Sequence, residues 1–108
     1  MKWRLIEEAH EWEEMVRRFS EANFLQAWAW GEAQGALGKQ VLRLASEDGE
    51  MLAQGVVERA RRGSYLAVAG GPLLDWREEE RLAAILSELG ARAQALGCRF
   101  VRLRPQYE

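Results

Sequence analysis

The stretch YLAVAGGPLLDW, Tyr65 to Trp76, joins two different patterns of secondary structure. Its first half is apolar enough for a buried strand, and its second half leads into a long helical pattern. Between them stands a turn made of Gly70, Gly71 and Pro72. A glycine-rich turn from strand to helix can hold a phosphate on free backbone amides, but a proline has no amide to offer. The turn therefore either binds a ligand, forms a wall of a binding groove or only reverses the chain.

Strand and helix patterns extend upstream from this turn. The dipeptide Asp48-Gly49 is typical of a hairpin, because glycine adopts a positive φ at little cost. Alternating or apolar runs predict strands, and spacing of three to four residues predicts helices. The predicted strands are residues 3–6, 40–46, 51–59 and 65–69, and the predicted helices are residues 8–19 and 27–34.

Downstream of the turn, the pattern predicts one long helix and one more strand. Asp75 is the expected N-cap, with Glu78 at the capping-box position, and Gly97 is expected to end the helix near Leu96. Residues 99–104 then alternate between apolar and basic side chains. Three strands in a meander, a crossover helix and a parallel strand predict an α/β (α+β) fold with a mixed sheet.

The length of 108 residues suits a single domain, residues 1–108. A last parallel strand with an open edge is normally covered. We therefore expect a domain that is incomplete at its C-terminus, or one completed by a second domain or by a homodimer.

The charge balance argues against a global field for nucleic acid or membranes, because the formal net charge is −2. An RNA contact would need a local patch. Two arginine clusters are available for one, although solvated strand ends are the simpler interpretation of both. They are Arg59, Arg61 and Arg62, and Arg99, Arg102 and Arg104.

Few residues suit metal binding or nucleophilic catalysis. Cys98 is the only cysteine and His10 the only histidine, so we expect neither a disulfide nor a metal site, and a buried structural thiol at Cys98. No apolar run is long enough to span a membrane, and the N-terminus lacks a signal core, so the expected location is cytoplasmic.

Three segments in order resemble the Fem-type (FemABX) aminoacyltransferases, which add amino acids to the stem peptide of peptidoglycan precursors. They are NFLQAWAWGEAQGALGKQVLRL (23–44), YLAVAGGPLLDW (65–76) and ALGCRFVRLRP (95–105). The resemblance implies the first of two GNAT-like acyltransferase domains, aminoacyl-tRNA as donor, a peptidoglycan precursor as acceptor, no cofactor, and inactivity of this chain alone. Two alternatives stay open: an N-acyltransferase of the same fold with a small acyl donor, and a non-catalytic interaction module.

The candidate substrate-binding residues are Trp30, Gly71, Pro72 and Arg102. Trp28 and Trp30 are two residues apart, so one is expected in the core and the other on a ligand platform, and for Trp30 both roles stay open. Gln26 is expected to tie down loop backbone. Pyrophosphate binding at the Gly-Gly-Pro turn is not expected, because the turn lacks a basic residue and one amide. No catalytic residue is identified from the spacing.

Overall fold

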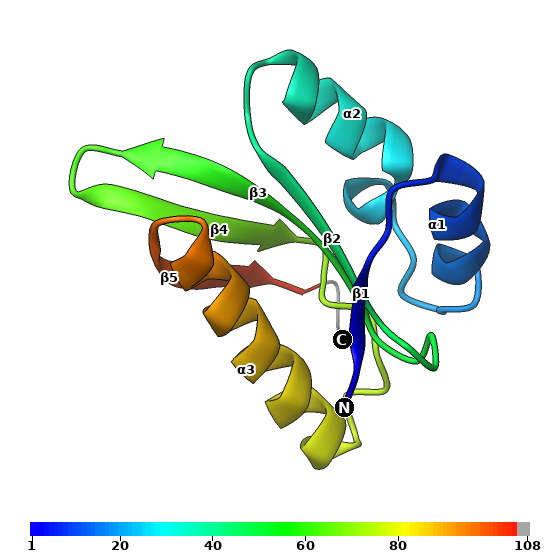
Figure 1. Cartoon of the computed structure of the whole chain (residues 1–108). Coiled ribbons are helices and arrows are strands. Elements are labelled where there is room, and N and C mark those ends of the chain that lie inside the picture. Colours follow the sequence, from blue (N-terminus) through cyan, green and yellow to red (C-terminus); the bar gives the residue numbers. More distant parts are fainter. Residues whose placement is uncertain (106–108) are drawn as a thin grey trace.

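The structure is a computed structural model, and it describes residues 1–105 of the chain. These residues form one five-stranded sheet with helices on both of its faces (Figure 1). In chain order the elements are β1 (Trp3–Leu5), α1 (Ala9–Val16), the 3₁₀ helix η1 (Phe24–Gln26), α2 (Trp28–Ala36), β2 (Val41–Ser46), β3 (Leu52–Ala60), β4 (Gly63–Ala69), α3 (Glu79–Ala95) and β5 (Cys98–Arg104).

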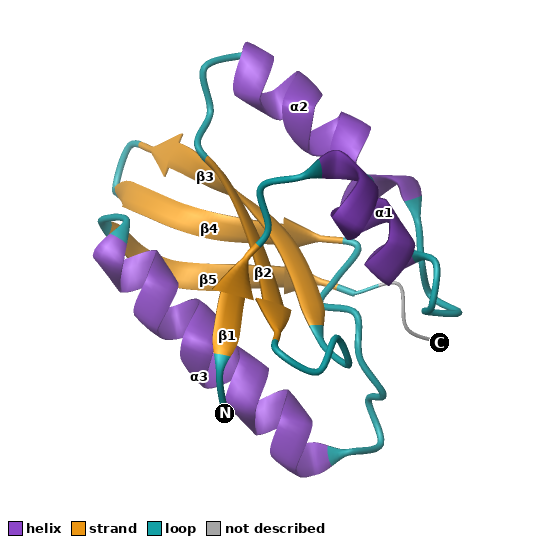
Figure 2. Cartoon of the chain, turned by 45° about the vertical axis from the view of Figure 1, so that its right-hand side comes forward, coloured by secondary structure: helices purple, strands orange, loops and turns teal. Residues whose placement is uncertain are grey.

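The strands lie in the order β1-β2-β3-β4-β5. The first four strands pair antiparallel, and β5 pairs parallel with β4 after the crossover through α3. The predicted mixed sheet, with its meander and crossover helix, is therefore confirmed. Helices α1 and α2 lie on one face of the sheet and α3 lies on the other (Figure 2).

Two apolar clusters hold these layers together. The cluster under α3 contains Leu66 and Val68 of β4 with Ile85, Leu89 and Ala93 of the helix. These three helical residues lie four positions apart and therefore share one face of the helix. The cluster under α1 centres on Trp12, which is fully buried. Burial of a large apolar side chain stabilises a fold by about 1.5–3 kcal/mol.

The β2–β3 hairpin turns at the predicted Asp48-Gly49 dipeptide, where Gly49 has a φ of 75°. The Asp48 carboxylate accepts hydrogen bonds from Ser46 Oγ at 2.7 Å, the Glu50 amide at 3.0 Å and Arg81 Nη1 at 3.0 Å. These hydrogen bonds lower the pKa of Asp48 to about 2, and the one from Ser46 has the largest effect. The hairpin is thereby tied to α3.

The predicted start of α3 is wrong. The helix begins at Glu79, and Glu78 precedes it in an extended conformation without a side-chain cap. Asp75 instead accepts the backbone amide of Arg77 at 3.1 Å and pairs with its guanidinium at 3.0 Å, which lowers the pKa of Asp75. The carboxylate is thus used in a turn before the helix. The predicted end is confirmed, since Gly97 follows the helix with a φ of 81°.

Candidate functional site

The Gly-Gly-Pro turn is built around the side chain of Gln26. This side chain is fully buried. Its Nε2 donates to the carbonyl oxygens of Ala69 at 2.7 Å and Gln54 at 3.0 Å, and its Oε1 accepts the Gln54 amide at 2.8 Å. Gln26 therefore joins β3 to the end of β4 where the regular ladder between the two strands stops. The prediction that it ties down backbone is confirmed.

The two glycines of the turn lie against the same segment. A Cβ on Gly71 would be 2.9 Å from Gln26 Cδ, closer than packed carbon atoms approach. Gly70 has a φ of 73°, and its carbonyl accepts Asn23 Nδ2 at 2.8 Å. Glycine suits both positions because it allows the close approach and the positive φ. The stretches around NFLQ and GGP, far apart in the sequence, thus fit one another.

The amides of the turn are largely engaged inside the sheet. The Gly70 amide donates to Arg104 O at 2.8 Å and the Leu73 amide donates to Leu52 O at 2.7 Å, while Pro72 has no amide. Residues 70–74 are all buried, and the Gly71–Pro72 peptide bond is cis. A phosphate-binding nest needs several free amides that converge, and these contacts remove two of them.

The network continues from Gln54 to α2. The Gln54 Oε1 accepts Arg43 Nε at 2.7 Å, and its Nε2 donates to Ala27 O at 2.9 Å. The Arg43 guanidinium lies 3.6 Å from the centre of the Trp28 ring and also bonds to Trp28 O at 3.0 Å. Trp28 packs against the cluster under α1. It is therefore the core member of the tryptophan pair.

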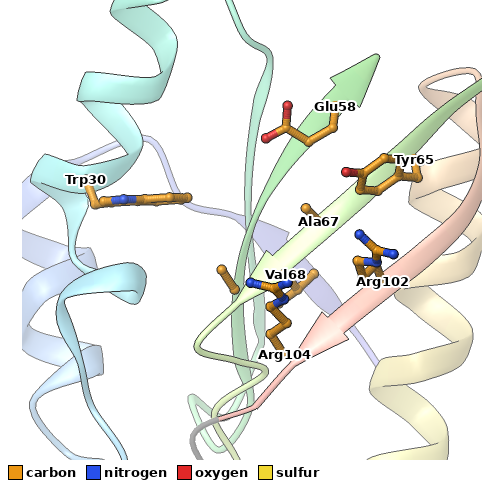
Figure 3. A pocket seen from close by; sticks show the side chains of 8 residues that line it. Trp30, Glu58, Tyr65, Ala67, Val68, Arg102 and Arg104 are labelled. Carbon is orange, nitrogen blue, oxygen red and sulfur yellow. The ribbon is translucent and has the colours of Figure 1, made fainter. Parts of the chain in front are cut away.

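A pocket of about 230 Å³ lies between α2 and the face of the sheet opposite α3 (Figure 3). Trp30 of α2 forms one wall. The sheet forms the floor. Only every second side chain of a strand points toward the pocket, because successive side chains point to opposite faces of the sheet. The residues that line the pocket from the sheet are Glu58, Tyr65, Ala67, Val68, Ala69, Arg102 and Arg104. The Val68 side chain itself packs in the cluster under α3, on the other face of the sheet.

The charged and aromatic groups of the pocket have different surroundings. The Glu58 carboxylate pairs with Lys39 Nζ at 3.0 Å. The Tyr65 ring stacks on Phe100, with ring centres 5.1 Å apart, and the Arg102 guanidinium lies 5.4 Å from the Tyr65 ring centre. Neither arginine of the pocket forms an ion pair with another residue of the described range 1–105. The arginines are therefore available to an anion or a carboxylate.

Two of the four predicted site residues, Trp30 and Arg102, meet in this pocket. Trp30 belongs to neither apolar cluster. Gly71 and Pro72 do not line the pocket, and their contact with a substrate stays a prediction. Sequence reasoning missed Glu58 and Tyr65, which face each other in the register of the β3–β4 hairpin. That register, read outward from the turn at Gly63, would have placed both on the face of Arg102.

Other classes of site find no support in the described part of the chain. Residues 1–105 contain no group of three or more His, Cys, Asp or Glu side chains arranged to hold a metal ion. No helix in this range combines the length and apolar character that crossing a bilayer requires. Cys98 is buried, as predicted, and His10 is exposed.

Comparison with known proteins identifies relatives of this arrangement. The family model described as the FemAB family matches residues 7–108. A crystal structure of FemX superimposes with a TM-score of 0.85 at 21% sequence identity; the match covers 100% of this chain and 28% of that chain. No curated protein matches significantly. Since the family model spans nearly the whole sequence, the chain belongs to the FemAB family.

Proposed function

We propose that this chain supplies the acceptor-binding face of an aminoacyltransferase that extends the stem peptide of peptidoglycan precursors. The donor is an aminoacyl-tRNA, and residues 1–108 act as a GNAT-like domain of the enzyme. Membership of the FemAB family supports the class of reaction. The pocket under Trp30 is the single observation that supports the placement of the acceptor.

The chemistry of the pocket suits a precursor that combines sugar, peptide and phosphate. The indole face of Trp30 offers an apolar surface for a sugar ring or a peptide side chain. Arg102 and Arg104 lie on the same face of β5 and offer planar guanidinium groups to a phosphate or a carboxylate. Tyr65 holds Arg102 near its ring, so one of the two anion contacts is positioned before binding.

In the transfer itself, the acceptor amine attacks the ester carbonyl carbon of the aminoacyl-tRNA. A C–N bond forms, the C–O bond to the ribose breaks, and the ribose oxygen leaves with a proton while the amine nitrogen loses one. We assign to this chain the orientation of the acceptor. Holding two reactants in a productive geometry can supply about 7–11 kcal/mol of a barrier, so orientation alone is a substantial contribution.

An N-acyltransferase that uses coenzyme A is the competing function. Such an enzyme needs converging backbone amides between the meander and the next helix to hold the pyrophosphate. The amides of Gly70 and Leu73 already donate to carbonyl groups, and the turn has no basic side chain. These contacts favour the aminoacyl-tRNA donor.

Calorimetry with UDP-N-acetylmuramoyl-pentapeptide and with acetyl-coenzyme A tests the proposal. We expect the chain to bind the pentapeptide precursor. Trp30→Ala and Arg102→Gln should each weaken this binding about tenfold, which corresponds to about 1.4 kcal/mol.

Two variants outside the pocket serve as matched controls. Leu37→Ala changes an exposed residue just after α2, and Arg92→Gln changes an arginine on α3. Both should bind the precursor as the unchanged chain does. Micromolar binding of acetyl-coenzyme A together with no binding of the precursor would exclude the proposed function.

A further inference from the structure

Helix α2 lies on the sheet without a buried apolar stripe of its own. Of its nine residues, all of which the structure describes, Gly31 alone is buried. Ala29, Ala33 and Ala36 are exposed. A helix on the surface of a domain normally packs through apolar side chains three to four residues apart. Beyond Trp28 at its first position, which packs against the cluster under α1, α2 needs another kind of contact to hold it.

The side chain of Arg43 provides this contact. It comes from the middle of β2 and is only 9% exposed. Its Nε donates to Gln54 Oε1 at 2.7 Å, and its Nη2 donates to Trp28 O at 3.0 Å and to Glu32 Oε2 at 3.1 Å. The guanidinium carbon lies 3.6 Å from the centre of the Trp28 ring. One buried side chain thus joins β2 and β3 to the first turn of α2.

The helix face toward the sheet is shaped for a guanidinium group. Trp28, Gly31 and Glu32 share that face, because they lie three and four residues apart. A Cβ on Gly31 would meet Arg43 Nη2 and Gln54 Oε1, so glycine lets the helix approach the guanidinium closely. A lysine could not make these contacts together, since its ammonium is a point charge without a planar fork of donors.

The position of Trp30 over the pocket depends on this helix. Trp30 extends from α2 toward the side chains of the sheet (Figure 3). It belongs to neither apolar cluster. Glu13 also holds α2, since its carboxylate accepts the Trp28 amide at 2.6 Å, but this contact acts on the first residue of the helix. A shift of the helix at Gly31 would therefore move Trp30 relative to Arg102 on the floor of the pocket.

We propose that Arg43 is a positioning residue of the pocket, which fixes α2 on the sheet and thereby places Trp30 opposite the arginines of β5. Arg43 does not line the pocket itself, so it acts through the helix. The inference rests on the proposed function for its ligand, since the acceptor is assigned to this pocket. Its effect on the acceptor is the contact with the indole face of Trp30.

Native-state hydrogen exchange tests the attachment of α2 without any ligand. Arg43→Met keeps the length of the side chain but removes its donors, so the amides of residues 32–36 should exchange at least about tenfold faster. Arg43→Lys should accelerate them nearly as much, because charge without the planar fork does not restore the contacts. The control Arg92→Met removes an ion-paired guanidinium from α3 and should leave the exchange of α2 unchanged.

Gly31→Ala tests the same attachment from the side of the helix. Helix propensity alone predicts slower exchange in α2, because alanine is a better helix former than glycine. The close approach to Arg43 Nη2 and Gln54 Oε1 predicts faster exchange, since the new Cβ would push the helix off the sheet. The direction of the change therefore separates the two effects, and this variant keeps Arg43.

Fluorine NMR of protein that contains fluorotryptophan reports on Trp30 itself, whose resonance is assigned with Trp30→Phe. In Arg43→Met this resonance should shift or broaden as the helix moves. The resonances of Trp3 and Trp76, which pack against the cluster under α3, should keep their positions. Arg92→Met should leave the Trp30 resonance in place.

Calorimetry with UDP-N-acetylmuramoyl-pentapeptide links the position of Trp30 to binding. Arg43→Met should weaken binding of this precursor about fivefold in the unchanged chain, but less than about twofold in the Trp30→Ala background. Such non-additivity is expected only if Arg43 acts through Trp30.

The inference is overturned if Arg43→Met accelerates exchange in β3 and β4 but not in α2, or if α2 exchanges as in the unchanged chain. It is also overturned if the Trp30 resonance does not change, or if the effects of Arg43→Met and Trp30→Ala on binding multiply in full. A precursor that binds no variant and not the unchanged chain would instead reject the proposed function. The exchange and fluorine measurements would then still decide whether Arg43 positions Trp30.

Discussion

Replacing Gln26 with leucine removes the link between β3 and the Gly-Gly-Pro turn while keeping a side chain of similar size. Three backbone groups lose their partner: the amide and carbonyl of Gln54 and the carbonyl of Ala69. Each buried polar group left without a hydrogen bond costs about 1–3 kcal/mol. We expect the free energy of unfolding to fall by about 3–5 kcal/mol, a large part of the 5–15 kcal/mol typical of a domain.

Urea unfolding followed by tryptophan fluorescence measures this loss. The reporter is favourably placed, because Trp12 is fully buried and its Nε1 donates to Gln26 O at 2.7 Å. For a slope of about 2 kcal/mol/M, the midpoint should fall by about 2 M. Gln94→Leu, at an exposed position of α3, should change stability by no more than about 0.5 kcal/mol.

A second variant tests the direction of the hydrogen bonds. In Gln26→Glu, a carboxylate would face the carbonyl oxygens of Gln54 and Ala69, so its charged form is disfavoured and the folded-state pKa is raised. A raised folded-state pKa gives stability that is present at low pH and lost as the pH rises. The midpoint of this variant should therefore increase from pH 8 to pH 5. A loss of less than 1 kcal/mol in Gln26→Leu would refute the role given to this side chain.

Two glycines and one aspartate give further predictions. Gly71→Ala should lower the free energy of unfolding by about 1–3 kcal/mol, because its Cβ would press on Gln26 Cδ at 2.9 Å. Gly90 lies in α3 with open space around it, so Gly90→Ala should raise the free energy of unfolding by about 0.5–1 kcal/mol. Thermal unfolding of both variants in one buffer measures the two changes. The pKa of Asp48 is lowered to about 2, so its contribution is present above about pH 4 and lost as the pH falls through 2. Because the side chain is 44% exposed, screening limits that contribution to about 1 kcal/mol, and the stability difference between the unchanged chain and Asp48→Asn should shrink toward zero from pH 5 to pH 2.

Much of the fold is predictable because each element has a clear period or a clear stop. The β2–β3 hairpin follows from Asp48-Gly49, and the end of α3 follows from Gly97. The start of α3 was mispredicted because Asp75 binds its neighbour Arg77 two residues on, a local competition that the capping pattern does not reveal.

The pocket was only partly predictable, because it depends on register and on the placement of α2. The meeting of Trp30 with Arg102 requires α2 to lie on the side of the sheet to which Arg102 points. The pairing of Glu58 with Tyr65 is fixed by the hairpin, whose turn the sequence does indicate at Gly63. The role of Gln26 between β3 and β4 was not predictable in detail, since the place where two strands stop pairing leaves no periodic signal.

The fit between Gln26 and Gly71 has a consequence for how related sequences vary. An amide of glutamine length fills the space that a Cβ at the glycine would enter, so the two positions share one volume. Substitutions at these sites should therefore occur as pairs during evolution, with a larger residue at position 71 accompanied by a shorter one at position 26. An aligned set of homologues in which the two columns change independently would contradict this coupling.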